Sequence, residues 1–303
     1  RLNRRQRQMC IRDRNNTTIE SIPGGLEDGI NYNEDTSKVT LVLSAPHKDF
    51  IYVSGDFNFW SPTSEYAMKK DSTSERFWIE IDGLEPGEIY TYQYWVSDLS
   101  PIDESPSLVK TADPFSTMVL SPFDDPWIPE NSYPNLPEYP YDFGIEREVT
   151  VLKTGQQPYN WQVDDFDKPK EEDLIIYEVL IRDFDADRTF QNLIDKIDYF
   201  KELNINAIEL MPVMEYEGNE SWGYNTAFHM SVDKFYGPEE KLKEFIDLCH
   251  QNGIAVILDL VMNHVMGRSP MNRMWMNDPD KNGWGEPSEE NPYFNEIATH
   301  TYG

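Results

Sequence analysis

Between Lys38 and Val96 the chain alternates short apolar runs with clusters of Pro, Gly, Asp and Ser. The runs are "KVTLVL", "FIYVSGDFN", "RFWIEI" and "IYTYQYWV". Several short β-rich runs at this spacing, each ended by turn residues, are typical of a small β-sandwich. We therefore predict an immunoglobulin-like β-sandwich over residues 15–112.

Residues 113–172 are rich in Pro, Asp and Ser and have no sustained apolar period. The stretch "DDPWIPENSYPNLPEYPYD" is excluded from a helix or a central strand, because proline lacks the backbone N–H that both structures need. We predict that this segment is a Pro-rich linker.

The pattern changes after Glu172. Three near-continuous apolar runs, "DLIIYEVLI", "NAIELM" and "IAVILDLV", are of the kind found in buried parallel strands. Two helical patterns lie between these runs. Between the first and second runs, apolar residues recur at helical spacing, namely Phe190, Leu193, Ile194, Ile197, Phe200 and Leu203. Between the second and third runs, the segment "GPEEKLKEFIDLCHQNG" has the start and stop signals of a helix. This strand–helix alternation predicts a parallel sheet covered by helices.

Both a doubly wound sheet and a (β/α)₈ TIM barrel have this element order. The nucleotide-binding form of the doubly wound sheet is disfavoured, because no glycine-rich phosphate turn follows any of the three strands. A whole barrel takes about 250 residues, whereas 131 residues follow Glu172. Residues 173–303 are therefore expected to be a truncated barrel, with the first three β/α units only.

The composition narrows the choice of partners. The chain has 303 residues, 55 acidic against 26 basic residues, and a formal charge of −29. This charge disfavours nucleic acid and anionic membranes as partners. No apolar run approaches the roughly 20 residues of a membrane span. The cysteines, Cys10 and Cys249, have no paired spacing that would indicate a disulfide framework.

The first 14 residues, "RLNRRQRQMCIRDR", differ from the rest because they hold six of the 26 Lys and Arg residues. Read back through the genetic code, "QMCIRDR" fits a transposase end sequence used to prepare sequencing libraries. We interpret residues 1–14 as a sequencing or cloning artefact and expect the true N-terminus to be missing. Localisation is therefore open between cytoplasm and periplasm or the extracellular space.

Candidate chemistry gathers where the predicted strands end. Ligands of parallel α/β folds bind at the carboxyl ends of the strands, and Asp259, Asn263 and His264 follow the third one. The long loop after the second strand carries Trp222 and Tyr224. Flat aromatic rings beside hydrogen-bonding groups suit sugars, which have apolar C–H faces and polar edges. Taken singly, each of these residues could instead be a cap, a turn former or a core side chain.

In the predicted sandwich, Phe57, Trp60 and Trp78 could form a platform for starch. Aromatic residues on alternating strands also fill the core of such a sandwich, and we favour that role for these three. No binding residue is assigned there.

Three segments in order, "IYEVLIRDF", "NAIELMPVMEYEGNESWGYN" and "GIAVILDLVMNH", resemble the first three strand regions of glycoside hydrolase family 13, the α-amylase family. Upstream, "YVSGDFNFW" and "DPF" resemble the carbohydrate-binding-like β-sandwich that precedes the barrel in branching and debranching enzymes. The resemblance covers everything except the leader.

The resemblance implies roles for individual residues. Tyr224 would stack under the sugar at the cleavage subsite, His264 would bond a hydroxyl of that sugar, and Asp259 would orient an arginine from a later strand. Trp222 would either contact sugar or pack the loop. Asn263 matches a position that binds calcium in many α-amylases but not throughout the family. The resemblance therefore requires no cofactor and leaves calcium open.

Retaining glycosidases use a nucleophile and an acid/base, two carboxyl groups about 5–5.5 Å apart. In this family they are an Asp and a Glu from the fourth and fifth strands, so no catalytic residue is expected in this chain. Glu178 and Glu209 lie within the first two strands, and we expect them to pack inside the barrel. The 303-residue chain should be inactive and poorly stable, because an open barrel leaves a strand edge unpaired.

For the full-length protein the resemblance implies a retaining enzyme that hydrolyses α-1,4 or α-1,6 bonds of α-glucans. Glucan branching or another transglycosylation is the alternative, because transfer shares the covalent intermediate. A non-catalytic carbohydrate-binding protein is a second alternative. A barrel enzyme for phosphorylated metabolites is a more distant alternative, because no glycine-rich phosphate site or Schiff-base lysine follows a predicted strand. This alternative stays open, since barrel phosphate loops usually follow strands seven and eight.

Overall fold

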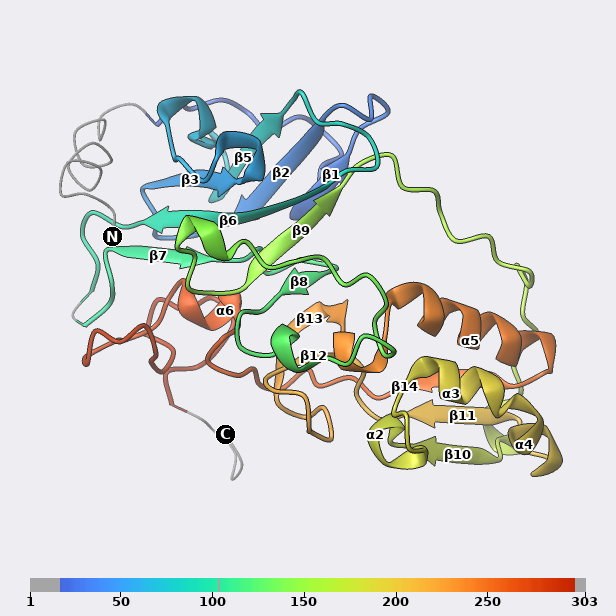
Figure 1. Ribbon diagram of the computed structural model, residues 1–303. Coiled ribbons are helices and arrows are strands. Elements are labelled where there is room, and N and C mark those ends of the chain that lie inside the picture. The colour runs from blue at the N-terminus through green and yellow to red at the C-terminus, as the bar shows by residue number, and fades with distance from the viewer. Residues whose placement is uncertain (1–16, 103, 298–303) are drawn as a thin grey trace. The chain divides into compact units, whose positions relative to one another are not determined.

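The computed structural model describes residues 17–102 and 104–297 (Figure 1). The stretch 1–14, interpreted above as an artefact, lies outside these residues. The described residues divide into two compact units: unit 1 comprises those within 17–122, 137–156 and 265–297, and unit 2 comprises residues 123–136 and 157–264. Each unit has its own hydrophobic core.

Unit 1 contains two antiparallel sheets. The first has the order β1-β2-β5-β4, with β1 at Gly29–Tyr32, β2 at Val39–Ser44, β5 at Arg76–Ile81 and β4 at Lys69–Lys70. The second has the order β3-β6-β9-β8, with β3 at Phe50–Gly55, β6 at Ile89–Ser97, β9 at Val149–Lys153, β8 at Val119–Leu120, and β7 (Leu108–Thr111) also paired with β6. Short helical segments of this unit are η1 (Asp56–Asn58), η2 (Ser64–Tyr66), η4 (Tyr141–Phe143) and α6 (Pro270–Arg273).

Residues from both sheets fill one core, which includes Leu41, Ile51, Phe77 and Tyr94. The aromatic residues considered above as a starch platform belong to the interior, since Trp60 is 7% exposed and Trp78 6% exposed. Phe57 packs against the same core, whereas Trp60 and Trp78 are buried outside this cluster.

The compact units do not follow the domain limits expected from the sequence. The expected linker, 113–172, contributes β8 and β9 to the second sheet of unit 1. Residues 265–297 were expected to continue the barrel, yet they fall in unit 1, and Trp275 lies in its core. The short strand "VTVLK" was hidden by its Pro-rich surroundings. The assignment of a binding domain and a catalytic domain stays a prediction.

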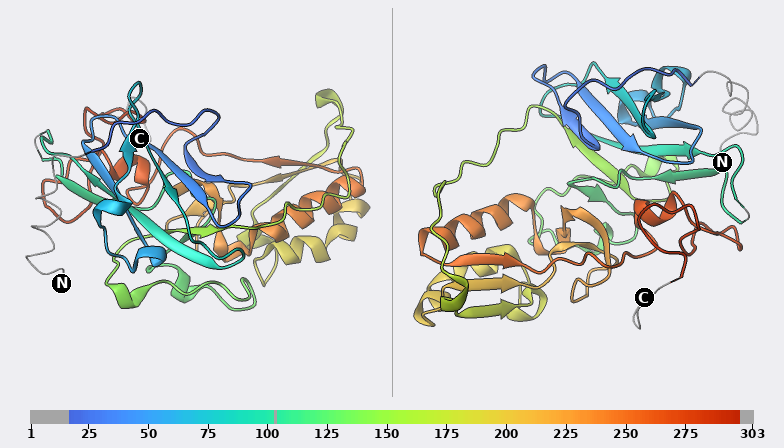
Figure 2. Two further views of the ribbon diagram at one scale, coloured as in Figure 1. Left: turned by 90° about the horizontal axis from the view of Figure 1, so that it is seen from above. Right: turned by 180° about the vertical axis from the view of Figure 1, so that it is seen from behind.

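Unit 2 contains a parallel sheet of β10 (Ile176–Val179), β11 (Ala207–Leu210) and β14 (Ala255–Leu258) in that spatial order. The helices are α2 (Ile181–Phe184), α3 (Phe190–Asp195), α4 (Ile197–Glu202) and α5 (Glu239–Gln251), with single turns η3 (Asp125–Trp127), η5 (Glu171–Asp173) and η6 (Lys234–Tyr236). Figure 2 shows α3 and α5 along one face of this sheet. The predicted alternation of strands and helices is observed in this unit.

The first predicted helix is divided into α3 and α4 at Lys196. Thr189 caps α3, because its side chain accepts a hydrogen bond from the backbone N–H of Asn192. The second helix starts after Pro238 and is followed by Gly253 at φ 73°, as the sequence indicated. None of the helices within 17–102 and 104–297 is both long and apolar enough to cross a membrane.

A hairpin of unit 2 was not expected from the sequence. The stretch after β11 was interpreted as a long loop, but it contains the antiparallel strands β12 (Met214–Tyr216) and β13 (Thr226–Val232). Residues 217–225 connect the two strands, and we call this connection the 217–225 loop. It carries both Trp222 and Tyr224.

Candidate functional site

The side chains of Tyr224 and Asp259 meet at the carboxyl ends of two parallel strands. Asp259 directly follows β14, and its backbone N–H donates to the carbonyl oxygen of Leu210 at the end of β11, at 3.0 Å. The hydroxyl of Tyr224 donates a hydrogen bond of 2.5 Å to Oδ2 of Asp259. The structure therefore brings together two residues that lie 35 positions apart in the sequence.

His264 contacts the same tyrosine through the backbone. Its Nε2 lies 2.6 Å from the carbonyl oxygen of Tyr224. Because a carbonyl oxygen only accepts, this contact requires the proton on Nε2. The other ring nitrogen, Nδ1, is buried and forms no hydrogen bond within the described part of the chain. In this arrangement His264 fixes the position of Tyr224, and its expected contact with a sugar hydroxyl stays a prediction.

The electrostatic environment keeps the Tyr224 hydroxyl protonated. The hydrogen bond to Asp259 raises the pKa of Tyr224 to about 12, with partial burial and the charges of Asp259, Glu178 and Glu209 adding to the effect. Glu178 and Glu209 are register partners on β10 and β11. A neutral phenol with 40% of its surface exposed can offer an aromatic face to a ligand while its hydroxyl stays bound to Asp259.

The 217–225 loop is held by hydrogen bonds of its own. The amide of Asn225 donates to the carbonyl oxygen of Glu217 at 2.7 Å, and the hydroxyl of Ser221 bonds to the Asn225 side chain. Gly223 has φ +90°, and a Cβ atom there would lie 2.4 Å from the carbonyl oxygen of Pro212. Only glycine fits this position without displacing the loop.

Trp222 lies on the same loop with 58% of its surface exposed. It therefore does not pack the loop against a core within unit 2. Its expected contact with sugar stays a prediction, as do the roles of the other predicted site residues.

Asn263 is exposed, on the segment that follows β14. Calcium takes six to eight oxygen ligands, usually including several carboxylates. Over 17–102 and 104–297 there is no group of three His, Cys, Asp or Glu side chains that could hold a metal ion. A calcium site at Asn263 therefore stays a prediction.

A second calcium-like spacing escaped the sequence interpretation. Residues 278–289, "DPDKNGWGEPSE", follow the order of ligands in calcium loops. The carboxylate of Asp278 accepts hydrogen bonds from the backbone N–H groups of Asn282 and Gly283. The three acidic groups of this spacing do not converge, since the described residues contain no such cluster. The spacing therefore does not define a metal site.

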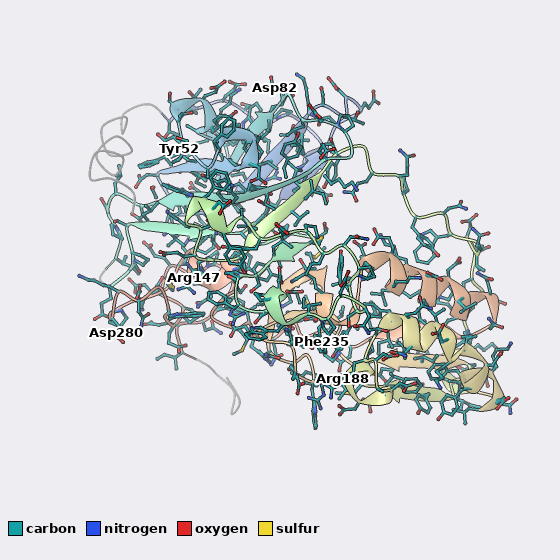
Figure 3. All side chains as sticks on the ribbon, in the orientation of Figure 1. Tyr52, Asp82, Arg147, Arg188, Phe235 and Asp280 are labelled. Carbon is teal, nitrogen blue, oxygen red and sulfur yellow. The ribbon has the colours of Figure 1, made fainter. Side chains whose placement is uncertain are left out.

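Sequence reasoning also missed a buried charge cluster beside the 217–225 loop. Lys234 follows β13 and is 2% exposed, and its ammonium group pairs with Glu215 of β12 and lies 3.3 Å from Oδ1 of Asp125. Phe235, the next residue, is labelled in Figure 3. The backbone N–H of Tyr216 donates to the nearby carboxylate of Asp233. The cluster therefore connects both strands of the hairpin to residues 123–136.

The pKa values of this cluster are set by burial. Burial raises the pKa of Glu215 to about 7, although Lys234 opposes this shift. Burial also works to lower the pKa of Lys234, but Glu215 and Asp125 outweigh it and raise that pKa above its ordinary value. The adjacent charged residues Asp233 and Lys234, between Val232 and Phe235, were the signal that the sequence offered.

Comparison with known proteins identifies a family for residues 178–297, a stretch that includes parts of both units. Residues 178–297 match the model of the α-amylase family, described as "Alpha amylase, catalytic domain". This part of the chain belongs to the α-amylase family, which confirms the resemblance drawn from the three strand segments.

Individual relatives cover different parts of the chain. A malto-oligosyltrehalose trehalohydrolase of Saccharolobus solfataricus is 39% identical over 107 residues, which are 35% of this chain and 19% of that protein. A 1,4-alpha-glucan branching enzyme of Chlamydia felis is 31% identical over 233 residues, which are 75% of this chain and 28% of that protein. The chain thus spans less than a third of the length of either relative.

Solved structures agree at the level of the fold. A pullulanase of Group B Streptococcus, solved in complex with maltotetraose, has a TM-score of 0.60 and 21% identity over 88% of this chain and 38% of its own. A putative alpha amylase of Salmonella typhimurium has a TM-score of 0.59 and 21% identity over 86% of this chain and 38% of its own. The fold is that of α-amylase-family proteins, whose catalytic domain is related to the TIM barrel.

Proposed function

We propose that this chain is part of a retaining, α-glucan-active enzyme, and that Tyr224, Asp259 and His264 form one wall of its sugar-binding subsite. In this proposal the sheets of unit 1 form an immunoglobulin-like sandwich, and β10, β11 and β14 are the first three strands of a (β/α)₈ barrel. The observation that carries the proposal is the pair of contacts that Tyr224 makes, through its hydroxyl with Asp259 and through its carbonyl with His264.

The contacts of Tyr224 support a stacking role. Tyr224 is held at its hydroxyl and at its backbone carbonyl. Little conformational freedom is therefore lost when a sugar binds, and preorganised contacts favour affinity. The exposed face of the ring matches the apolar C–H face of a glucose unit. Asp259 has a second carboxylate oxygen that can accept a hydroxyl or orient a cationic side chain, and Trp222 extends the aromatic surface along the loop.

The reaction would be a double displacement. An aspartate attacks the anomeric carbon while a glutamate protonates the leaving oxygen, and water or a sugar hydroxyl then releases the covalent glycosyl group. Both reacting carboxyl groups are assigned to barrel strands that follow β14. Tyr224, Asp259 and His264 would bind and orient the sugar without taking part in bond cleavage.

Transfer to a sugar hydroxyl is the second candidate function. It is favoured by the Chlamydia felis relative, a branching enzyme whose match covers 75% of this chain and therefore residues of both units. Hydrolysis and transfer use the same glycosyl-enzyme, and Tyr224 would serve both. The two activities differ in which acceptor reaches the intermediate.

Calorimetric titration of the 303-residue chain with maltotetraose tests the proposal. Tyr224→Ala should weaken binding about tenfold, because stacking of one ring contributes on the order of 1 kcal/mol. Met230→Ala is the matched control, since Met230 is 56% exposed on β13 and is not one of the residues proposed to bind the sugar. Equal affinity of the Tyr224→Ala variant and the unaltered chain would overturn the assignment. Release of reducing ends from starch by the chain alone would overturn the placement of the reacting groups.

A further inference from the structure

Two histidines of unit 2 connect the same two segments of the chain. His229, on β13, has its Nε2 atom 2.9 Å from the carbonyl oxygen of Val261. His264 has its Nε2 atom 2.6 Å from the carbonyl oxygen of Tyr224. The first bond runs from the hairpin to the segment that follows β14, and the second runs from that segment back to the 217–225 loop. The two imidazole rings therefore link these segments twice.

The ring of His229 has one role that its surroundings define, which is to donate to Val261. Its other nitrogen, Nδ1, is buried and has no hydrogen-bond partner among the described residues. Burial lowers the pKa of His229 below its ordinary 6.5, against the hydrogen bond with Val261, and the charge of His264 adds to the lowering. The ring is therefore neutral at pH 7, and its single proton lies on Nε2, since a carbonyl oxygen can only accept.

Val261 is the buried point of the segment that His229 holds. Its side chain is 4% exposed, whereas its neighbours Leu260 and Met262 are 52% and 75% exposed. Exposed side chains make few contacts that could fix the backbone between them. The bond from His229 therefore holds this segment at its middle, between Asp259 and the ring of His264.

We infer that His229 is a positioning residue of the proposed sugar subsite. By fixing Val261, it sets the place of the segment 259–264. Asp259 and His264, at the two ends of this segment, hold the hydroxyl and the carbonyl of Tyr224. The inference rests on the proposed function, because it takes Tyr224 as the residue that stacks on the sugar. His229 acts through the order that it gives to this ring before the sugar binds, and such preorganisation favours affinity.

Calorimetric titration of the 303-residue chain with maltotetraose tests the inference. His229→Phe keeps a flat ring but has no N–H donor, and it should weaken binding about fivefold, the effect of losing one ordinary hydrogen bond. His229→Gln keeps an amide N–H donor and should bind within about twofold of the unaltered chain. Met230→Ala is the control, because Met230 is the next residue on β13 and is 56% exposed. Thermal unfolding is measured alongside, so that each titration uses folded chain.

A double-mutant cycle shows whether His229 acts through Tyr224. In the Tyr224→Ala background no ring is left to position, so the addition of His229→Phe should change the affinity by less than about twofold. A residue that only stabilises the fold, or that binds sugar by itself, would cause the same fold-change in both backgrounds.

The outcomes separate this inference from the proposed function. A loss in His229→Phe that His229→Gln restores, and that is absent when position 224 is alanine, supports the inference. Unchanged affinity in His229→Phe overturns it, and so does a loss that His229→Gln does not restore or that is equally large in the Tyr224→Ala background. In each of these cases, weaker binding by Tyr224→Ala alone would leave the proposed function standing. Absence of binding by the unaltered chain overturns the proposed function and the inference with it.

Discussion

Replacement of Lys234 by methionine tests how the hairpin that carries Tyr224 is stabilised. Lys234 is 2% exposed, and Glu215, its partner, is 5% exposed. Removing the cation leaves a buried carboxylate without its counter-charge, which typically destabilises a protein by about 3–5 kcal/mol. A domain is stable by roughly 5–15 kcal/mol in total. The variant should therefore lose a large fraction of the stability of unit 2.

Urea denaturation followed by tryptophan fluorescence measures the loss. Lys241→Met is the matched control, because Lys241 forms an ion pair with Glu244 on α5 in which the two side chains are 37% and 45% exposed. Exposed pairs contribute about 0–1 kcal/mol. The expected difference between the two lysine variants is thus at least about 2 kcal/mol in the free energy of unfolding.

The pH dependence of the Lys234→Met variant gives a second readout. Burial raises the pKa of Glu215 to about 7 even though Lys234 opposes this shift. Without Lys234 the carboxyl group therefore takes up a proton at pH 6, which relieves part of the penalty. The loss of stability should be larger at pH 8.5 than at pH 6. Equal losses in Lys234→Met and Lys241→Met at both pH values would refute the view that the buried cluster stabilises the hairpin.

Two further expectations concern single residues. Burial raises the pKa of Asp113 from 3.8 to about 6, although hydrogen bonds from Phe115, Tyr94 and Tyr92 oppose this shift. The protonated carboxyl group of Asp113 therefore contributes stability that is fully present below pH 3.8 and is lost as the pH rises through 6. In thermal unfolding, the stability of unit 1 in the unaltered chain should fall by up to about 3 kcal/mol between pH 3.8 and pH 6. The Asp113→Asn variant should not show this fall. If the fall persists in the variant, Asp113 is not its cause. Gly223→Ala should lower both the unfolding temperature and the affinity for maltotetraose, because the new Cβ atom would lie 2.4 Å from the carbonyl oxygen of Pro212. Gly218, on the same loop, has φ +83° and open space around it. Gly218→Ala should therefore cost only the backbone penalty of about 1 kcal/mol. Equal behaviour of the two glycine variants would show that the contact with Pro212 does not position Tyr224.

The strand and helix pattern of unit 2 could be predicted because its apolar residues recur with the right periods. Buried parallel strands such as "NAIELM" are apolar throughout, and the helices follow a period of 3.6 residues. The hairpin of β12 and β13 could not be predicted in this way. Its strand β12 is only three residues long, and it includes Glu215, whose burial depends on Lys234 from the other strand.

The limits of unit 1 were hidden for a related reason. β9 pairs with β6, whose residues lie far away in the sequence, so its place in the sheet is set by tertiary contacts. The surrounding prolines and acidic residues gave the segment the composition of a linker. Trp275 likewise joins the core of unit 1 through packing and a hydrogen bond to the carbonyl oxygen of Pro46, which no local pattern indicates.

The candidate site was predictable in its members but not in its contacts. Strand ends and aromatic residues pointed to Tyr224, Asp259 and His264, because polar groups after buried strands have few structural reasons to gather. The sequence could not indicate that His264 contacts the backbone of Tyr224 or that Glu178 and Glu209 act on its pKa.

A crystal structure of the 303-residue chain soaked with maltotetraose is the most direct test of sugar binding at Tyr224. The expected density is a glucose ring stacked on the exposed face of Tyr224, with a hydroxyl within hydrogen-bonding distance of the Asp259 carboxylate. Maltotetraose bound elsewhere on the chain, with the ring of Tyr224 bare at saturating sugar, would contradict the central claim.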